Sequence, residues 1–298
     1  MSVTGQHRGG RLLAWAIATP LLLGIIVFAL YPFVYLILLS ISDSNLGQVF
    51  REWVGGDNYA DALTDDKYTA SIGRSVGFAL FTTALAMVLG LAVALLLDQA
   101  VRARNLLRTL ILLPLLTPPV TVAVMWQLLL TPHGGWLNSF LADLGLITQP
   151  ISFLGQPTAA FGFLCLADVW QWTPFVALMT FAALQTQPEE VVDAARMDGA
   201  TPWQLFTHVT LPMLLPALLG IALIKLVIAF KVFDLVFVLT AGGPGQATTV
   251  SSFHIYRVAI QQFDIGMAAT QTLVLAIVVG LVTLPFTMAH DRAERRLG

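Results

Sequence analysis

Six apolar segments of this chain are long enough to cross a lipid bilayer, and they constrain its fold more than any other feature. They cover residues 12–39, 72–97, 106–130, 159–184, 213–239 and 267–289. A membrane-spanning helix needs about 20 apolar residues, whereas the short alternating segments of a membrane β-barrel are absent from the sequence. We therefore expect an all-α integral membrane protein with about six transmembrane helices, organised as one domain over residues 1–298.

The low share of charged residues supports this class. Only 11% of the residues are charged and 57% are hydrophobic, whereas soluble domains carry about 25% charged residues. The first apolar run follows Arg8 and Arg11 and exceeds the core of a signal peptide, which is about 7–15 residues long. We expect it to be retained as the first span. Prolines inside several segments predict kinked helices packed against neighbours.

Lysine and arginine are distributed unevenly between the two sides of these spans. Nine lie on one side: Arg8, Arg11, Arg102, Arg104, Arg108, Arg196, Arg292, Arg295 and Arg296. Four lie on the other: Arg51, Lys67, Arg74 and Arg257. Because cytoplasmic connections carry the excess of positive charge, both termini and the connection after the fourth segment are predicted to be cytoplasmic. The connections 40–71 and 131–157 are predicted to lie outside.

The cytoplasmic connection at about residues 186–212 has the pattern of two short helices. Thr186-Gln187-Pro188-Glu189 fits a capping box, and Gly199 can take the positive φ that ends a helix. Thr201-Pro202-Trp203-Gln204 fits a second helix start, and Leu211-Pro212 is expected to close that helix before the fifth span. A loop with good caps that rests on lipid headgroups stays an open alternative to a knob that presses into a cytoplasmic partner.

This insert carries a family resemblance. The sequence Asp193-Ala194-Ala195, three residues, Gly199, nine residues and Val209-x-Leu211-Pro212 resembles the Glu-Ala-Ala–Gly–Ile-x-Leu-Pro motif of the membrane subunits of binding-protein-dependent ABC importers. Two residues depart from it: Asp193 replaces Glu and Val209 replaces Ile. Asp193 shortens the acidic side chain by one methylene, which bears on the ion pair that the motif makes with the ATPase.

Other stretches resemble the sugar-type branch of this family, which includes maltose, glycerol-phosphate and polyol permeases. They are "LSISDSN", "GGDNYADALTD", "RNLLRTLILLPLLTPPVTVAVMWQLLLTP", "WQWTPF" and "VFDLVFVLTAGGPGQATT", and together they cover nearly the whole chain. The resemblance implies a type I ABC importer permease fold of the maltose-transporter kind in a bacterial inner membrane. It also implies a second permease subunit, a cytoplasmic ABC ATPase dimer and an extracytoplasmic solute-binding protein as partners.

The resemblance further implies that the insert couples the chain to the ATPase. The implied coupling residues are Asp193, Ala194, Ala195, Asp198, Gly199, Ala200, Trp203, Phe206, Leu211 and Pro212.

Nothing in the sequence indicates an enzyme. A P-loop needs a lysine after a glycine, and none of the lysines, Lys67, Lys225 and Lys231, follows one. The five histidines lack the His-x-x-x-His spacing of a zinc site, and no Gly-x-Ser-x-Gly elbow occurs. We expect no catalytic, cofactor or metal site and no nucleic-acid partner, with ATP and magnesium bound by the partner ATPase. Ala241–Gly245 is expected to be an external turn.

Polar residues inside the apolar segments are candidates for the solute pathway, because charges in a bilayer are costly. Lys225 lies near the middle of the fifth segment and is either a pathway residue or the structural partner of another polar group. Lys231 and Asp234 are three residues apart and predict a local pair on one helix face. The other candidates are Asp168, Trp170 and Gln171, followed by Trp126, Gln127 and Gln271.

These observations predict a permease subunit of an ATP-driven importer for a sugar, polyol or related small solute. An ion-coupled secondary transporter that uses Lys225, Lys231 and Asp234 is the alternative. A scaffold that binds partners and transports nothing is a third. The sequence does not identify the solute.

Overall fold

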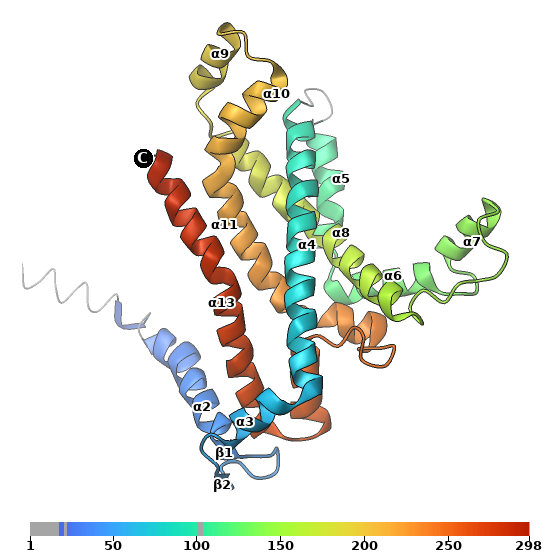
Figure 1. Cartoon of the computed structure of the whole chain (residues 1–298), viewed down its shortest axis with the longest axis vertical. Coiled ribbons are helices and arrows are strands. Elements are labelled where there is room, and N and C mark those ends of the chain that lie inside the picture. The colour runs from blue at the N-terminus through green and yellow to red at the C-terminus, as the bar shows by residue number, and fades with distance from the viewer. Residues whose placement is uncertain (1–17, 21–22, 100–103, 298) are drawn as a thin grey trace, which may run out of the picture. The chain divides into compact units, whose positions relative to one another are not determined.

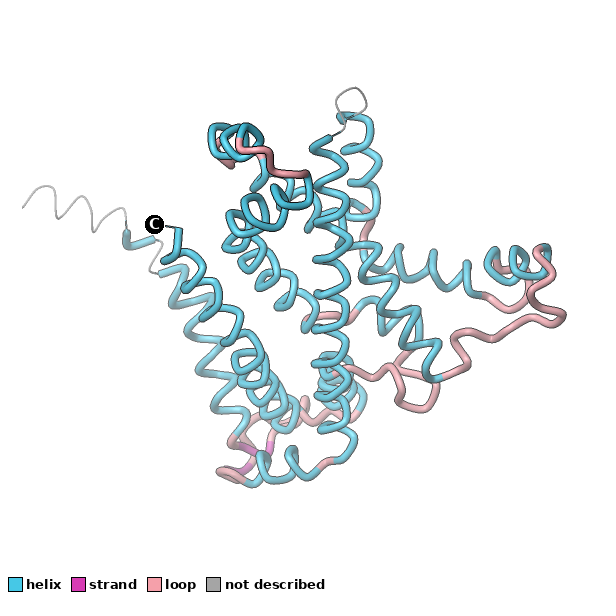
Figure 2. Tube along the Cα trace, turned by 45° about the horizontal axis from the view of Figure 1, so that its top comes forward, coloured by secondary structure: helices cyan, strands magenta, loops and turns pink. Residues whose placement is uncertain are grey.

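A computed structural model describes residues 18–20, 23–99 and 104–297 (Figure 1). The predicted start of the first span, together with Arg8, Arg11 and Arg102, lies outside these residues. Helices dominate the described part of the chain, and strands are confined to two residue pairs (Figure 2).

The described elements follow one another in a simple order. The α-helices are α2 (Tyr31–Ser40), α3 (Asp57–Thr64), α4 (Asp66–Gln99), α5 (Arg104–Leu116), α6 (Pro119–Leu130), α7 (Trp136–Asp143), α8 (Pro157–Leu184), α9 (Glu189–Met197), α10 (Pro202–Leu205), α11 (Leu211–Phe230), α12 (Ser251–Tyr256) and α13 (Ile265–Leu297). The strands are β1 (Ser42–Asp43) and β2 (Glu52–Trp53). Wider π-helical turns cover Ile26–Leu30, Phe206–Thr210, Val236–Thr240 and Arg257–Gln261.

Membrane-spanning length is reached by five helices in the described residues. They are Ala18–Ser40, Asp66–Gln99, Pro157–Leu184, Pro202–Phe230 and Ile265–Arg295. A bent pair, Thr109–Leu116 and Pro119–Leu130, makes a sixth if it is counted as one span. The prediction of an all-α chain with about six spans is confirmed.

The third predicted span is broken. Its two halves, α5 and α6, meet at 97°. The break falls at Pro118-Pro119, where neither residue has an N–H to donate and Pro118 is extended with φ −56° and ψ 141°. A residue that precedes proline is driven out of the helical region, so the double proline ends one helix and begins the next at a new angle.

The chain forms two compact units. Of the described residues, those up to Asp66 and Ile255–Val274 form the first, and those of Lys67–His254 and from Leu275 onward form the second. The first unit contains the antiparallel pair β1 and β2, in which Ser42 is opposite Trp53.

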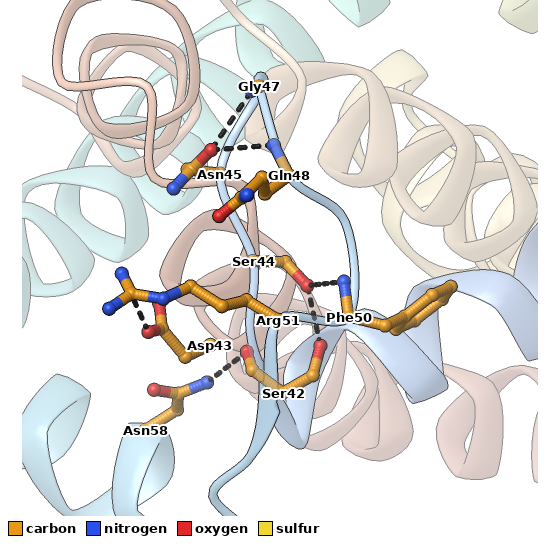
Figure 3. A network of polar contacts seen from close by, with 9 residues as sticks. All are labelled: Ser42, Asp43, Ser44, Asn45, Gly47, Gln48, Phe50, Arg51 and Asn58. Atoms are coloured by element: carbon orange, nitrogen blue, oxygen red, sulfur yellow. Dashed lines mark hydrogen bonds and ion pairs between the residues drawn. The ribbon is translucent and has the colours of Figure 1, made fainter.

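Short polar side chains hold the turn between β1 and β2 (Figure 3). The Ser44 hydroxyl accepts a hydrogen bond from the Phe50 amide at 2.8 Å and lies 2.7 Å from the Ser42 hydroxyl. The Asn58 side chain donates to the Ser42 carbonyl at 3.1 Å, which ties α3 to β1. Because these groups replace missing backbone partners, a loop with very short strands keeps a defined shape.

Close approach of α4 and α8 builds the core of the second unit. A Cβ atom added at Gly90 would lie only 2.5 Å from Val176 Cγ1, so the glycine allows the two helices to touch. Val176 also packs with Ala86 and, on α11, with Ile221. Small residues at such crossings are typical of membrane helix packing, where van der Waals contact replaces the hydrophobic effect.

Candidate functional site

The insert between α8 and α11 begins with α9, whose start differs from the prediction. Thr186 is not a helix cap: its hydroxyl donates to the Ala183 carbonyl at 2.8 Å and so belongs to the last turn of α8. Pro188 is the N-cap of α9, without a side-chain hydrogen bond. The predicted capping box at Thr186 is therefore wrong, because the turn that follows α8 uses this hydroxyl. The acidic first turn, Glu189 and Glu190, is confirmed.

The end of α9 follows the prediction closely. Gly199 has φ +82°. The amide of Ala200 donates to the Ala195 carbonyl at 3.1 Å, and that of Gly199 donates to the Arg196 carbonyl at 3.0 Å. These two bonds form a Schellman motif, which satisfies the last carbonyls of the helix. The turn between the two insert helices therefore has a fixed geometry.

The second insert helix begins with the predicted capping box. The Gln204 amide donates to the Thr201 hydroxyl at 3.4 Å, and the Thr201 amide donates to the Gln204 side-chain oxygen at 2.9 Å. Pro202 occupies the first turn, where its missing N–H costs nothing.

This second helix does not close at Leu211-Pro212, so that prediction is wrong. α10 continues through the π-helical turn Phe206–Thr210 into α11 and gives one helix of 29 residues, Pro202–Phe230. In the widened turn the Leu211 amide donates to the Phe206 carbonyl, five residues back. The wider turn leaves room for Pro212, which would clash with the carbonyl four residues earlier in a regular α-helix.

The insert exposes apolar side chains and charges together. Met197 is 88% exposed and Trp203 72% exposed, and the Trp203 ring lies 5.9 Å from that of Phe206. Asp193 pairs with Arg196 at 3.1 Å on the exposed surface of α9. Of the other implied coupling residues, Ala194, Asp198 and Pro212 are exposed, and Ala195, Ala200 and Leu211 are half-buried. A combination of exposed Trp and Met is typical of a protein-binding surface.

A buried ion pair joins the two helices that flank the insert. Asp168 on α8 and Lys225 on α11 are 57 residues apart in sequence, and their Oδ2 and Nζ atoms lie 2.7 Å apart. The side chains are 2% and 0% exposed. The Lys225 Nζ atom also lies 6.0 Å from the centre of the Trp172 ring. The sequence left two roles open for Lys225, a pathway residue or the structural partner of another polar group. The structure provides such a polar group, Asp168.

Gln171 stabilises the break between α5 and α6. Its side-chain Nε2 donates to the Thr117 carbonyl at 3.1 Å, one residue before the double proline. Its Oε1 atom is buried and has no hydrogen-bond partner among the described residues. An unpaired buried acceptor is costly.

A pocket of about 160 Å³ opens beside this glutamine. Its lining comes from α6, α8, α11 and the segment that follows α11. It comprises Pro119, Asp168, Gln171, Trp172, Ile228, Lys231, Val232, Phe233, Asp234 and Leu235. The pocket thus collects charged and polar side chains and an indole ring.

Lys231 and Asp234 do not share a helix face, so the predicted local pair is wrong. α11 ends at Phe230, where the amides of Lys231 and Val232 donate to carbonyls only three residues back. Among the ion pairs of the described residues, none joins Lys231 to Asp234. Lys231 therefore lies in the turn that follows α11, whereas Asp234 begins the next helical stretch, which continues into the π-helical turn Val236–Thr240. Both residues line the pocket.

The remaining pathway candidates are distributed more widely. The Trp126 and Trp170 rings lie 6.5 Å apart, and Trp170 is 38% exposed. Gln127 on α6 is exposed. Gln271 is buried and belongs to the first unit.

Two of these arrangements had no local signal in the sequence. The pairing of Asp168 with Lys225 joins different helices, and so does the contact of Gln171 with Thr117. Two charged residues in apolar segments are a general hint that each needs a partner, but the hint does not identify which residue that partner is. The predicted turn at Ala241–Gly245 is present, with positive φ at Ala241, Gly242 and Gly245.

Residues 86–298 match the family described as the inner membrane component of binding-protein-dependent transport systems. The chain belongs to this family. It is 32% identical over 286 residues to the trehalose/maltose transport system permease protein MalF of Thermococcus litoralis, covering 95% of this chain and 94% of the relative. It is 31% identical to the sn-glycerol-3-phosphate transport system permease protein UgpA of Pectobacterium atrosepticum, covering 95% of each.

Solved structures agree on the fold. A chain of a bacterial ABC transporter involved in the import of the acidic polysaccharide alginate superposes with a TM-score of 0.85 at 22% identity, over 98% of this chain and 99% of that one. A chain of the MetNI methionine ABC transporter gives a TM-score of 0.55 over 77% of this chain and 95% of that one. The expected fold is therefore confirmed, and the chain is a permease component of a sugar-type ABC importer rather than an enzyme.

Proposed function

We propose that this chain, with a second permease subunit, forms the translocation pathway for a sugar, polyol or related small solute. Residues 186–212 couple that pathway to a separate ATPase. The observation that carries the proposal is the uninterrupted helix Pro202–Phe230, which begins in the exposed insert and ends beside the pocket. A displacement of the insert would therefore move the pocket lining directly.

The surface of the insert suits a groove on the ATPase. Met197 and Trp203 supply the exposed apolar area, and large apolar side chains of this kind contribute most of the energy at protein interfaces. Asp193 is held by Arg196 and can exchange that exposed partner for a cation on the ATPase at little cost. Asp193 is one methylene shorter than Glu, so it reaches less far toward the ATPase but can still form this contact.

The work of the chain is a change of conformation rather than a reaction. ATP and magnesium are bound by a cytoplasmic ABC ATPase dimer, and an extracytoplasmic solute-binding protein delivers the solute. Each partner shifts the balance between two states only by binding one state more strongly. The chain lies in a bacterial inner membrane with both termini in the cytoplasm, as the distribution of lysine and arginine indicates.

The pocket beside Gln171 is the part of the pathway with suitable chemistry. The Gln171 amide and the Trp172 ring line it, and such groups match the hydroxyl groups and C–H faces of a sugar or polyol. The names of the two relatives, a trehalose/maltose and a glycerol-3-phosphate permease, support this solute class. Trp126, Gln127, Trp170 and Gln271 are further candidates for the pathway.

The proposal is tested by uptake in proteoliposomes that contain the chain with its partner permease, ATPase and binding protein. Labelled sugars and polyols are offered with ATP inside, with and without an uncoupler. We expect uptake of at least one solute that requires ATP and survives the uncoupler. Uptake that collapses with the uncoupler while ATP is maintained would instead support an ion-coupled transporter.

Asp193→Lys sharpens the test of coupling. We expect this variant to insert and assemble but to lose ATP-driven uptake, because it reverses the charge presented to the ATPase. Its control is Asp143→Lys, which changes an exposed acid at the end of α7 and outside the insert. Equal uptake by Asp193→Lys and the unaltered chain would count against the coupling role.

A further inference from the structure

The Asp168–Lys225 ion pair lies between the two helices that lead into and out of the insert. α8 enters the insert and α11 leaves it, as Figure 1 shows for the ends that carry α9 and α10. The two charged atoms lie 2.7 Å apart, and this is an ion pair between buried side chains. The pair therefore joins α8 and α11, the two helices connected by the insert, within the second unit.

Stability alone does not explain such a pair. Removing two charges from solvent is expensive, and replacing a buried ion pair by apolar side chains of similar size is often neutral or stabilising. Unlike apolar contacts, an ion pair favours one position of one helix along the other. The best-attested role of buried polar pairs is to fix such a register.

The remaining contacts between these helices are poorly suited to fixing a register. Val176 on α8 meets Ile221 on α11 in an apolar cluster with Ala86. Apolar contacts are non-directional and can form again after one helix slides along the other. Between α8 and α11 themselves, the ion pair is the directional contact among the described hydrogen bonds and salt bridges. Gln187, just beyond α8, also donates to the Thr210 carbonyl at 3.0 Å, but this bond lies at the insert and not beside the pocket.

The register of α8 against α11 matters because both helices contribute to the pocket. One turn beyond Asp168, α8 contributes Gln171 and Trp172, and about 9 Å beyond Lys225 the chain contributes Lys231. A slide of one helical turn, about 5.4 Å, would separate these two sides of the lining.

We propose that Asp168 and Lys225 are positioning residues that lock the register of α8 against α11. Movement of the insert then reaches the pocket as motion of one body. This inference rests on the proposed coupling function. Without the pair, the helices still pack, but part of the displacement at the insert is lost as sliding.

The decisive variant is the apolar replacement Asp168→Leu with Lys225→Met, which removes both charges and keeps the volume. We expect it to insert and to assemble with the ATPase, while solute transported per ATP hydrolysed falls by about tenfold or more, within the range of typical coupling energies. If the pair only holds the helices together, the double variant will transport within about twofold of the unaltered chain, and the proposal is overturned.

A milder variant keeps the test valid if the double variant does not accumulate. Asp168→Glu retains both charges but moves the carboxylate by one methylene. A register role predicts a lower yield of transport per ATP with an unchanged affinity of the assembly for the loaded binding protein. An unchanged yield would contradict the proposal.

A distance measurement separates this inference from the proposed function. Spin labels at Met179 on α8 and Leu215 on α11, both on exposed positions, report the register directly in a Cys165→Ala background. We expect one narrow distance distribution in the unaltered pair and a broader or shifted one in the double variant. Identical distributions in the unaltered pair and the double variant overturn the register lock whatever the transport yield. Absent ATP-driven uptake by the unaltered chain instead overturns the proposed function.

Discussion

The insert and the buried pair differ in how their structure is specified. In the insert, neighbouring residues determine the geometry: Gly199 ends one helix, and Thr201 with Gln204 begins the next. In the membrane core, contacts between residues 57 and 54 positions apart determine it, through Asp168 with Lys225 and Gln171 with Thr117. The difference suggests a division of work, in which a locally stable knob docks to a partner and long-range polar contacts determine how its motion spreads.

Breaking the buried pair on one side should have the largest effect on stability. Lys225→Met leaves the Asp168 carboxylate buried without a cation, which costs about 3–5 kcal/mol. We expect a correspondingly lower thermal midpoint of the purified assembly. Lys231→Met is the control, because Lys231 is exposed and should change stability by about 0.5 kcal/mol or less. Equal losses in the two variants would contradict the importance of the pair.

Loss of the Gln171 side-chain donor should have the next largest effect. Gln171→Leu leaves the Thr117 carbonyl unsatisfied at the break between α5 and α6, at a cost of about 1–3 kcal/mol. The same substitution at the exposed Gln127 serves as a matched control. Chemical unfolding in detergent measures the stability of both variants. A loss of stability in Gln127→Leu as large as that in Gln171→Leu would contradict this explanation.

A side chain at Gly199 should strain the insert without affecting the core. Gly199→Val forces a β-branched residue into the left-handed region, at about 1–2 kcal/mol, so ATP-driven uptake should fall while the protein stays in the membrane. Gly199→Asn should retain most of the uptake, because Asn tolerates positive φ. Similar uptake by the Val and Asn variants would show that this turn does not need its conformation.

Removal of the second cap should have the smallest effect. Thr201→Ala loses one half of the capping box and costs about 1 kcal/mol. Hydrogen exchange at the amides of residues 203–206 should therefore quicken by about fivefold, while Thr201→Ser keeps the slow rate. Unchanged exchange in the alanine variant would mean that α10 is held by α11 rather than by its cap.

Much of the fold followed from the sequence because its signals are local or cumulative. Runs of 20 or more apolar residues identified the spans, and Thr201 with Gln204 identified a helix start. Local signals failed where a neighbouring element competed for the same group. Thr186 was taken by the last turn of α8, and Pro212 was accommodated by a π-helical turn that continues into α11.

The site was less predictable because its residues meet only in three dimensions. Asp168, Gln171 and Lys225 were candidates for their polarity in an apolar environment, but no spacing connects α8 to α11 or to the break at Thr117. The spacing of Lys231 and Asp234 predicts a shared helix face because the apolar run continues past Phe230. α11 ends there with a tightened last turn. No glycine or proline in the sequence predicts this end.

Site-specific crosslinking from the insert tests the central claim most directly. In a Cys165→Ala background, Met197→Cys carries a thiol-specific crosslinker on the most exposed apolar side chain of the insert. Leu146→Cys, in the connection predicted to lie outside and 67% exposed, is the control. The account predicts that Met197→Cys is captured by the ATPase subunit and Leu146→Cys is not. Capture of lipid alone from Met197→Cys, with ATPase present and active, would contradict it.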